Sequence, residues 1–132
     1  LNRESWHELH HFGHLDVQKT YNRVVEGSDD FIERHGYKRI GGRYKCVEPN
    51  TDKIAIFCHG GFGLTWLSHL LEIPPALMWS GFWLPTSSVT IVLFDERTPE
   101  WAVPRCLTVA DTSHLYKAGL EVLPRGIVEN YY

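Results

Sequence analysis

Two stretches of the chain repeat apolar residues at the spacing of an amphipathic helix. In residues 16–36 the apolar side chains recur about every 3.6 positions, and Gly36 follows at a place where helices commonly end. In residues 64–71 four leucines fall on one face, and Pro74 and Pro75 stop the pattern. The spacing therefore predicts two helices, and the aromatic segment 76–85 is predicted to form a shorter helix and a loop.

Other apolar runs have the length of strands. A Gly41-Gly42 turn precedes the first of them, at residues 43–47, and residues 88–94 form another that is rich in β-branched side chains. Residues 54–58 read Ile-Ala-Ile-Phe-Cys and are apolar throughout. An unbroken apolar run of this length is typical of a strand that is covered on both faces.

The last predicted strand covers residues 101–109, and residues 95–100 would join it to the preceding strand as a hairpin. Pro104 has no amide hydrogen to donate, so this strand is predicted at an edge of the sheet. After a polar turn at 110–112 the chain is predicted to form a short helix and a loop. The order of strand, helix and paired strands indicates an α/β layered domain.

Composition and charge narrow the possible functions. The 132 residues make one domain or part of one, and because the first residue is Leu1 we expect part of one. Thirteen basic and sixteen acidic residues give a net charge of −3, without the basic field that nucleic acid or an anionic membrane would select. No apolar run approaches the ~20 residues of a membrane helix, and no signal peptide opens the chain. The three cysteines, an odd number, are expected to be free thiols in a cytoplasmic protein.

A His-Glu-x-x-His pattern near the start of the sequence is typical of zinc peptidases. On a helix, His7 and His11 would bind zinc while Glu8 acted as the general base. Only six residues precede the pattern, which leaves no room for the sheet that holds a peptide substrate, and no third ligand follows at the required spacing. A metalloprotease is therefore a distant alternative, and no metal site is predicted.

Two further combinations have a structural explanation. Arg34-His35-Gly36 is the tripeptide in which certain phosphatases carry phosphate on histidine, but that chemistry needs the end of a buried strand, and here the tripeptide follows a helix. Gly36 as the residue that ends the helix accounts for it. Cys58 and His59 are neighbours in a predicted strand, so their side chains would point to opposite faces and could not form a nucleophile–base pair. Cys58 is predicted to be a small core residue.

Residues 54–62 carry the most information about function. The predicted strand ends at His59, two glycines follow, and a helix begins at once. Ligands of open α/β sheets bind at the carboxyl ends of strands, and the backbone N–H groups at the start of a helix favour an anion. His59 could donate a hydrogen bond to phosphate or move a proton there, while Gly60 lets the anion approach the backbone. The structural alternative is a histidine satisfied by the backbone in an ordinary turn.

Lipase-like hydrolases form an oxyanion hole from a similar His-Gly-Gly turn, but no G-x-S-x-G motif follows here and too little chain remains for that fold. The order of motifs instead resembles the two-histidine phosphatases, the superfamily that includes the phosphoglycerate mutases. Residues 54–61 resemble its second His-Gly motif, residues 85–90 its small-residue turn, and residues 110–115 its late Asp-x-Ser-His-Leu signature. Residues 31–44 resemble the segment before the second histidine in bacterial members.

This resemblance implies a three-layer α/β sandwich with a mostly parallel central sheet. It also implies a mechanism without metal or cofactor, in which a first histidine attacks phosphorus while a second histidine and two arginines stabilise the phosphoryl oxygens. His59 matches the second histidine, and Gly60 lies where a backbone amide could reach the phosphate. His69 and His114 match recurrent positions expected to be structural. The first strand with its Arg-His-Gly, the second arginine and the acid are expected upstream, so residues 1–132 would be a single, incomplete catalytic domain.

The sequence thus favours a bacterial, cytoplasmic phosphatase that hydrolyses a small phosphate monoester through a phosphohistidine, with His59 as catalytic and His59 and Gly60 as phosphate-binding residues. Its expected partners are a phosphorylated small molecule or inorganic phosphate, and neither nucleic acid nor a membrane. Since a missing strand would leave an edge of the sheet bare, the chain is also expected to associate with itself. A non-catalytic protein on the same scaffold is the main alternative.

Overall fold

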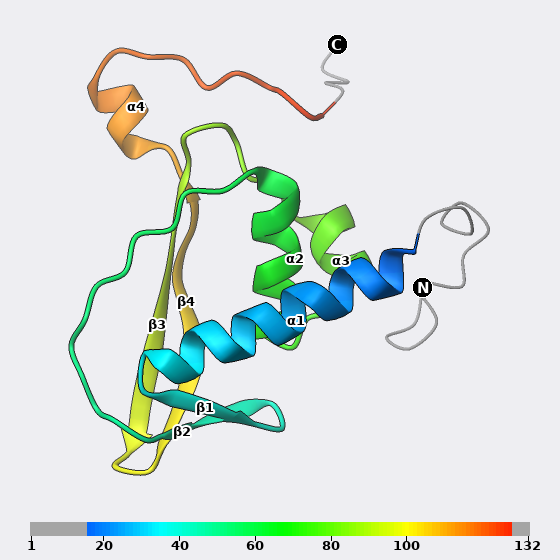
Figure 1. Cartoon of the computed structure of the whole chain (residues 1–132). Helices are drawn as coiled ribbons and strands as arrows, with labels where there is room; N and C mark the ends of the chain where they lie inside the picture. Colours follow the sequence, from blue (N-terminus) through cyan, green and yellow to red (C-terminus); the bar gives the residue numbers. More distant parts are fainter. Residues whose placement is uncertain (1–15, 128–132) are drawn as a thin grey trace.

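In the computed structural model, which describes residues 16–127, a four-stranded antiparallel sheet carries its main helices on one face (Figure 1). The helices are α1 (Val17–Arg34), α2 (Gly60–Leu70), α3 (Pro75–Gly81) and α4 (Ser113–Lys117). The strands are β1 (Tyr37–Ile40), β2 (Arg43–Cys46), β3 (Val89–Thr98) and β4 (Trp101–Asp111), and their order in the sheet is β1-β2-β4-β3.

The first predicted helix is confirmed together with both of its ends. The Asp16 carboxylate accepts a hydrogen bond from the Lys19 amide at 3.1 Å, which satisfies one of the free N–H groups at the start of α1. At the other end His35 caps the helix and Gly36 adopts a φ of +90°, a conformation that glycine reaches without a steric cost. The chain therefore leaves α1 at Gly36 and turns directly into β1, which the sequence did not predict.

Two local hairpins and one pairing between them build the sheet. The Gly41-Gly42 turn joins β1 to β2, and a second tight turn joins β3 to β4. The hairpins meet where Tyr44 of β2 pairs with Ala102 of β4. The prediction of β4 as an edge strand is wrong, because β4 lies between β2 and β3. Pro104 is tolerated since the pairing with β2 involves only the start of β4 and ends before it.

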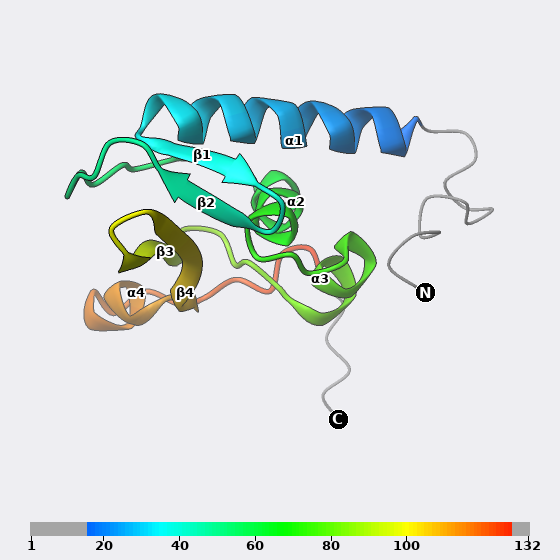
Figure 2. The same ribbon diagram turned by 90° about the horizontal axis from the view of Figure 1, so that it is seen from below.

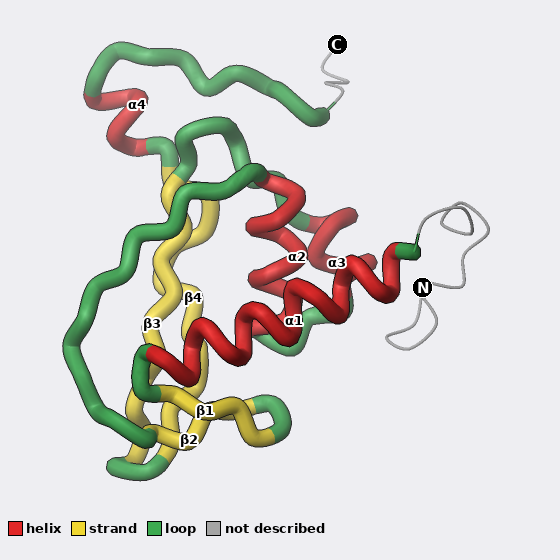
Figure 3. Tube along the Cα trace, in the orientation of Figure 1, coloured by secondary structure: helices red, strands yellow, loops and turns green. Residues whose placement is uncertain are grey.

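The predicted mostly parallel sheet is also wrong, and so is the strand over residues 54–58. Every strand pair in the described residues is antiparallel, and residues 47–59 form a long extended loop (Figure 3). The physical reason is that each hairpin closes through neighbours in the sequence, whereas a parallel pair needs a crossover and an open strand edge in the right place. The apolar run shows that this segment favours burial, but it does not specify a partner for it.

Two clusters of buried side chains join the helices to one face of the sheet. The first includes Ile32 of α1, Tyr37, Tyr44, Leu70 and Ala102. Leu64, Leu67 and Met78 form the second, with Val92 of β3 and Leu84 packed against it. Figure 2 shows α1 lying over the β1–β2 hairpin and α2 between that hairpin and α3. Within the described residues the helices thus cover one face, and the opposite face of β3 and β4 leaves six aliphatic side chains exposed: Val89, Ile91, Leu93, Val103, Leu107 and Val109. Between residues 16 and 127, no element forms the third layer of the expected sandwich on that face.

Among residues 16–127, no helix has both the length and the apolar character that a membrane crossing would need.

Candidate functional site

The start of α2 provides the chemistry that was expected of residues 59–61. His59 is the residue at which the helix begins, and its carbonyl accepts the first helical hydrogen bond from the Gly63 amide at 2.9 Å. Since the N–H groups of residues 60–62 come before that bond, they have no acceptor within the helix. The first turn contains no acidic residue, so nothing in it opposes the positive end of the helix dipole. An anion would be stabilised here.

The His59 side chain is exposed and makes no capping hydrogen bond with the helix that it precedes. A histidine that served only to end a turn would be expected to bond to the backbone, which is the structural alternative considered for this position. The geometry therefore leaves the imidazole free of that role, on the residue that immediately precedes the unpaired amides of α2.

The three glycines at the start of α2 are there for different reasons. A Cβ atom at Gly63 would lie 2.9 Å from Leu84 Cδ1, so that glycine is required by packing. A Cβ at Gly61 would lie 3.1 Å from the Trp79 indole, which rests against the first turn. At Gly60 the nearest atom would be 3.4 Å away, an ordinary contact. Packing therefore does not demand glycine at position 60, and its missing side chain leaves the backbone amide accessible.

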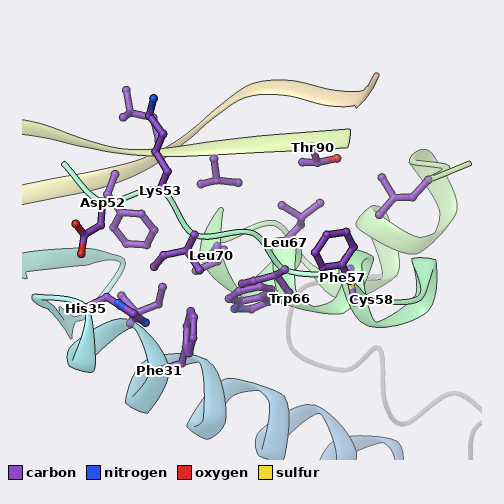
Figure 4. Close-up of a pocket in the computed structure, with 18 of the residues that line it drawn as sticks. Phe31, His35, Asp52, Lys53, Phe57, Cys58, Trp66, Leu67, Leu70 and Thr90 are labelled. Atoms are coloured by element: carbon purple, nitrogen blue, oxygen red, sulfur yellow. The ribbon is translucent and has the colours of Figure 1, made fainter. Parts of the chain in front are cut away.

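A groove of about 960 Å³ runs from His59 and Gly60 along the side of α2 (Figure 4). Figure 4 shows side chains of α1 and α2, among them Phe31 and Trp66, on one side and Thr90 of β3 on the other. Most of the lining is apolar. The groove therefore resembles a binding cleft in size and in character, with polar groups concentrated near its ends.

Hydroxyl groups gather at the end of the groove next to His59. Thr86, Ser87 and Ser88 form the turn before β3 and line this end, and Thr90 follows them on the strand. Ser87 has a φ of +63°, a strained conformation for a serine, which fixes the direction of the turn. The local pattern of these residues gave no reason to assign them to a site, although they lie in the small-residue turn noted in the resemblance.

Charged residues lie at the far end of the groove, where the lining includes His35, Asp52, Lys53 and Glu96. The Tyr37 hydroxyl donates a hydrogen bond to Glu96 Oε1 at 2.8 Å. Burial and this carboxylate raise the pKa of Tyr37 to about 12. No arginine is among the lining residues in the described part of the chain, and Lys53 is the one lysine among them.

The other predicted residues fall into three groups. Cys58 is exposed, so its prediction as a core residue is wrong, and the three thiols are free as expected. His35 stands at the end of α1 with its ring 4.7 Å from that of Phe31, as the helix-end explanation of Arg34-His35-Gly36 requires. Residues 7–11, with the zinc-binding pattern, lie outside the described residues. Within those described, no group of three or more potential metal ligands comes together.

His69 occupies a buried structural position, in agreement with its expected role. Its Nε2 atom lies 2.7 Å from Asp29 Oδ1, which ties α2 to α1, and only 6% of the residue is exposed. Burial lowers the pKa of His69, and the positive charge of Arg39 lowers it further. The hydrogen bond to Asp29 acts in the opposite direction and raises it. His114 is exposed in the first turn of α4.

Comparison with known protein families identifies the class of protein to which this fold and site belong. The sequence model of the histidine phosphatase superfamily (branch 1) matches residues 3–106. The chain therefore belongs to the histidine phosphatase superfamily, which includes the phosphoglycerate mutases named in the resemblance. No curated protein and no solved structure gives a match. The superfamily supports a function in phosphoryl transfer and leaves the substrate undefined.

Proposed function

We propose that this chain forms the second-histidine half of a phosphatase site that hydrolyses a small phosphate monoester. The observation that carries the proposal is the position of His59, exposed and without a capping bond, at the start of a helix whose first amides are unpaired. The site residues are His59 as catalytic group and, with Gly60, as phosphate ligand. Membership of the histidine phosphatase superfamily supports the same reading.

In the proposed reaction a histidine nitrogen attacks phosphorus and the bond to the alcohol oxygen breaks. The alcohol leaves with a proton from an acid, and water then hydrolyses the phosphohistidine to free histidine and inorganic phosphate. Throughout, the negative charge lies on the phosphoryl oxygens. The His59 imidazole would donate a hydrogen bond to one of them and the Gly60 amide to another, in a position fixed before the substrate arrives. No metal or cofactor takes part in this scheme.

We propose that the attacking histidine and the acid belong to sequence that precedes Leu1. Arg34-His35-Gly36 does not supply the attacking histidine in this scheme, because it ends α1 and His35 packs against Phe31. We further propose a bacterial, cytoplasmic enzyme, a location that the free thiols support.

The absence of arginine from the groove lining of the described residues favours a second candidate function. A scaffold that binds a phosphorylated ligand without turnover needs the helix N-terminus and His59 but not the full set of charges that stabilises the transition state. The two candidates agree on phosphate binding at Gly60 and differ in hydrolysis.

Phosphate binding can be tested on this chain by NMR titration with inorganic phosphate. We expect the amide signals of residues 60–62 to shift, and His59→Ala to weaken binding about tenfold or more, the effect of losing a hydrogen bond to a charged group. His114→Ala, which removes an exposed histidine from α4, is the matched control and should bind like the parent. Equal binding by the His59 variant would refute its role as a ligand.

Turnover can be tested with p-nitrophenyl phosphate and the protein in its natural full length. A phosphatase should hydrolyse it in the presence of EDTA and lose activity on His59→Ala. Binding without hydrolysis would favour the scaffold function, whereas activity abolished by EDTA would favour a metal-dependent reaction.

A further inference from the structure

The hydroxyl group of Thr65, in the second turn of α2, reaches back to the first turn of that helix. Thr65 Oγ1 lies 2.9 Å from the Gly61 carbonyl oxygen and donates a hydrogen bond to it. In an α-helix the same carbonyl also accepts the bond from the backbone amide four residues further on. The Gly61 carbonyl therefore accepts two hydrogen bonds, one from the helix backbone and one from a side chain.

The Trp79 indole of α3 determines which way the Thr65 hydroxyl points. The Trp79 Nε1 atom lies 3.2 Å from Thr65 Oγ1. An indole N–H can only donate, so the hydroxyl oxygen accepts this bond and the hydroxyl hydrogen is left for the Gly61 carbonyl. The three groups thus form a chain of hydrogen bonds that runs in one direction, from Trp79 through Thr65 to Gly61.

The same indole contacts α2 at a second point. α3 lies beside α2 in both ribbon views (Figures 1 and 2), and a Cβ atom at Gly61 would lie 3.1 Å from the indole ring. Glycine at position 61 therefore allows the ring to rest on the first turn while its N–H reaches Thr65, one turn further along. Because two contacts hold one rigid ring, α3 fixes the direction of the bond from Thr65 to Gly61.

This bond bears on the candidate phosphate site because a carbonyl and the amide that follows it belong to one conjugated peptide group. The amide that shares a peptide group with the Gly61 carbonyl is that of Phe62, one of the first amides of α2 without an acceptor in the helix. Hydrogen bonds in a chain polarise one another, by about 10–30% for each bond. The hydroxyl bond to Gly61 therefore makes the Phe62 N–H a stronger donor.

We propose that Thr65 is a positioning residue of the phosphate site, which acts through the Gly61–Phe62 peptide group and does not touch the phosphate. The inference rests on the proposed function, since it requires an anion at the start of α2. The Trp79 ring holds the hydroxyl, the hydroxyl polarises the peptide group, and the Phe62 amide donates to a phosphoryl oxygen next to the one bound by Gly60. The alternative is a hydroxyl that bonds to the preceding turn only to satisfy itself, as threonines in helices commonly do.

NMR titration of this chain with inorganic phosphate distinguishes the two roles. Thr65→Val removes the hydroxyl with little change in shape, and we expect it to weaken phosphate binding about two- to threefold, the effect of losing one polarising bond. Thr65→Ser keeps the hydroxyl and should bind like the parent. Ser80→Ala is the matched control, because the Ser80 hydroxyl makes the same kind of bond on α3, to the Ala76 carbonyl at 2.7 Å. It should also bind like the parent.

Trp79→Phe tests the same chain of bonds if Thr65→Val does not fold. This variant keeps an aromatic ring over Gly61 and removes the N–H that holds the hydroxyl, so it should weaken binding in the same direction by a smaller factor. Urea denaturation gives the stability of each variant. A purely structural hydroxyl would change that stability and leave the phosphate affinity of the folded protein unchanged.

The outcomes separate this inference from the proposed function. A parent chain that binds no phosphate at residues 60–62 would refute both. If the parent binds and His59→Ala weakens binding, while Thr65→Val and Trp79→Phe bind like the parent, the positioning role alone is wrong. Binding weakened as much in Thr65→Ser as in Thr65→Val would overturn it too, because the loss would then not come from the hydroxyl.

Discussion

The two ends of α2 lie in regions of opposite character. Around its second half the polar atoms are buried and paired: His69 lies 2.7 Å from Asp29, and the Trp66 indole donates to Ser28 Oγ at 2.6 Å. Around its first turn the chain is open, with His59 exposed and Phe57 almost fully exposed. The closed region fixes the helix in place, and the open region presents its N-terminus to a ligand.

This difference shows how the fold divides its tasks. α1, β1 and β2 follow one another with short turns, and the contacts that close the region then bring α2 back onto α1, because His69–Asp29 and Trp66–Ser28 join residues 40 and 38 positions apart. The loop of residues 47–59 is bonded to the end of α1 near its start, through Val47 and Asn50, and then crosses the open region without pairing with any strand of the described residues. A binding site at the boundary combines a rigid helix with an accessible approach.

Replacing one aromatic residue in each region by alanine is expected to give the largest difference in the free energy of unfolding between the two regions. Tyr44 is fully buried, packs at 5.0 Å between ring centroids against Phe94, and accepts a hydrogen bond from Arg39 at 2.8 Å. Tyr44→Ala should lower the free energy of unfolding by about 3–5 kcal/mol. Phe57→Ala should change it by less than about 0.5 kcal/mol, because the ring is already exposed.

Urea denaturation of the three proteins measures both values, with the parent as reference. A loss of more than about 1 kcal/mol in the Phe57 variant would mean that residues 54–58 are buried in solution, as the sequence predicts. The comparison between the two regions would then be wrong for this segment.

A smaller effect is expected from alanine at two glycines with positive φ. Gly36 ends α1 at a φ of +90°, and a Cβ there would lie 2.3 Å from the Glu48 carbonyl oxygen. Gly41 has a φ of +64° and open space around it. Gly36→Ala should therefore cost about 2–4 kcal/mol, through backbone strain together with a clash, and Gly41→Ala about 1 kcal/mol, through strain alone. Thermal unfolding monitored by circular dichroism gives the ranking, and equal losses would show that the Glu48 contact is relaxed in solution.

The sequence predicted the elements that depend on local signals. Asp16 and Gly36 mark the ends of α1, and the prolines after residue 73 mark the stop of α2, because caps and breakers act on their own neighbours. It missed β1, whose four residues are too short for a periodic pattern, although the Gly41-Gly42 turn between two short polar–apolar runs was a signal for a hairpin.

The failures of sequence reasoning concern pairing over a distance. Residues 54–58 have the composition of a buried strand, but burial requires a partner at the edge of β3, and composition cannot state whether one is there. For the same reason Pro104 was assigned to an edge, since nothing in its neighbourhood shows how far β2 extends along β4. Within the candidate site, the sequence predicted that a helix follows His59 at once, and the structure agrees. The hydroxyl turn at residues 86–88 joins the groove only through the tertiary fold.

The smallest expected effect is a pH dependence of stability that comes from the closed region. Burial lowers the pKa of His69 below its ordinary value of 6.5, with Arg39 acting in the same direction and Asp29 against it. The unfolded chain therefore binds a proton at this residue before the folded chain does. Stability from His69 should be fully present above about pH 6.5 and should fall as the pH drops below that value. Urea denaturation at about pH 7.5 and about pH 5.5 measures the loss, a range that lies above the ordinary pKa values of Asp and Glu. His69→Gln should reduce this loss of stability. The contributions of all other histidines cancel when the parent and the variant are compared. A parent chain that gains more stability than this variant on acidification would show that the Asp29 contact outweighs burial, and that His69 is charged in the folded protein.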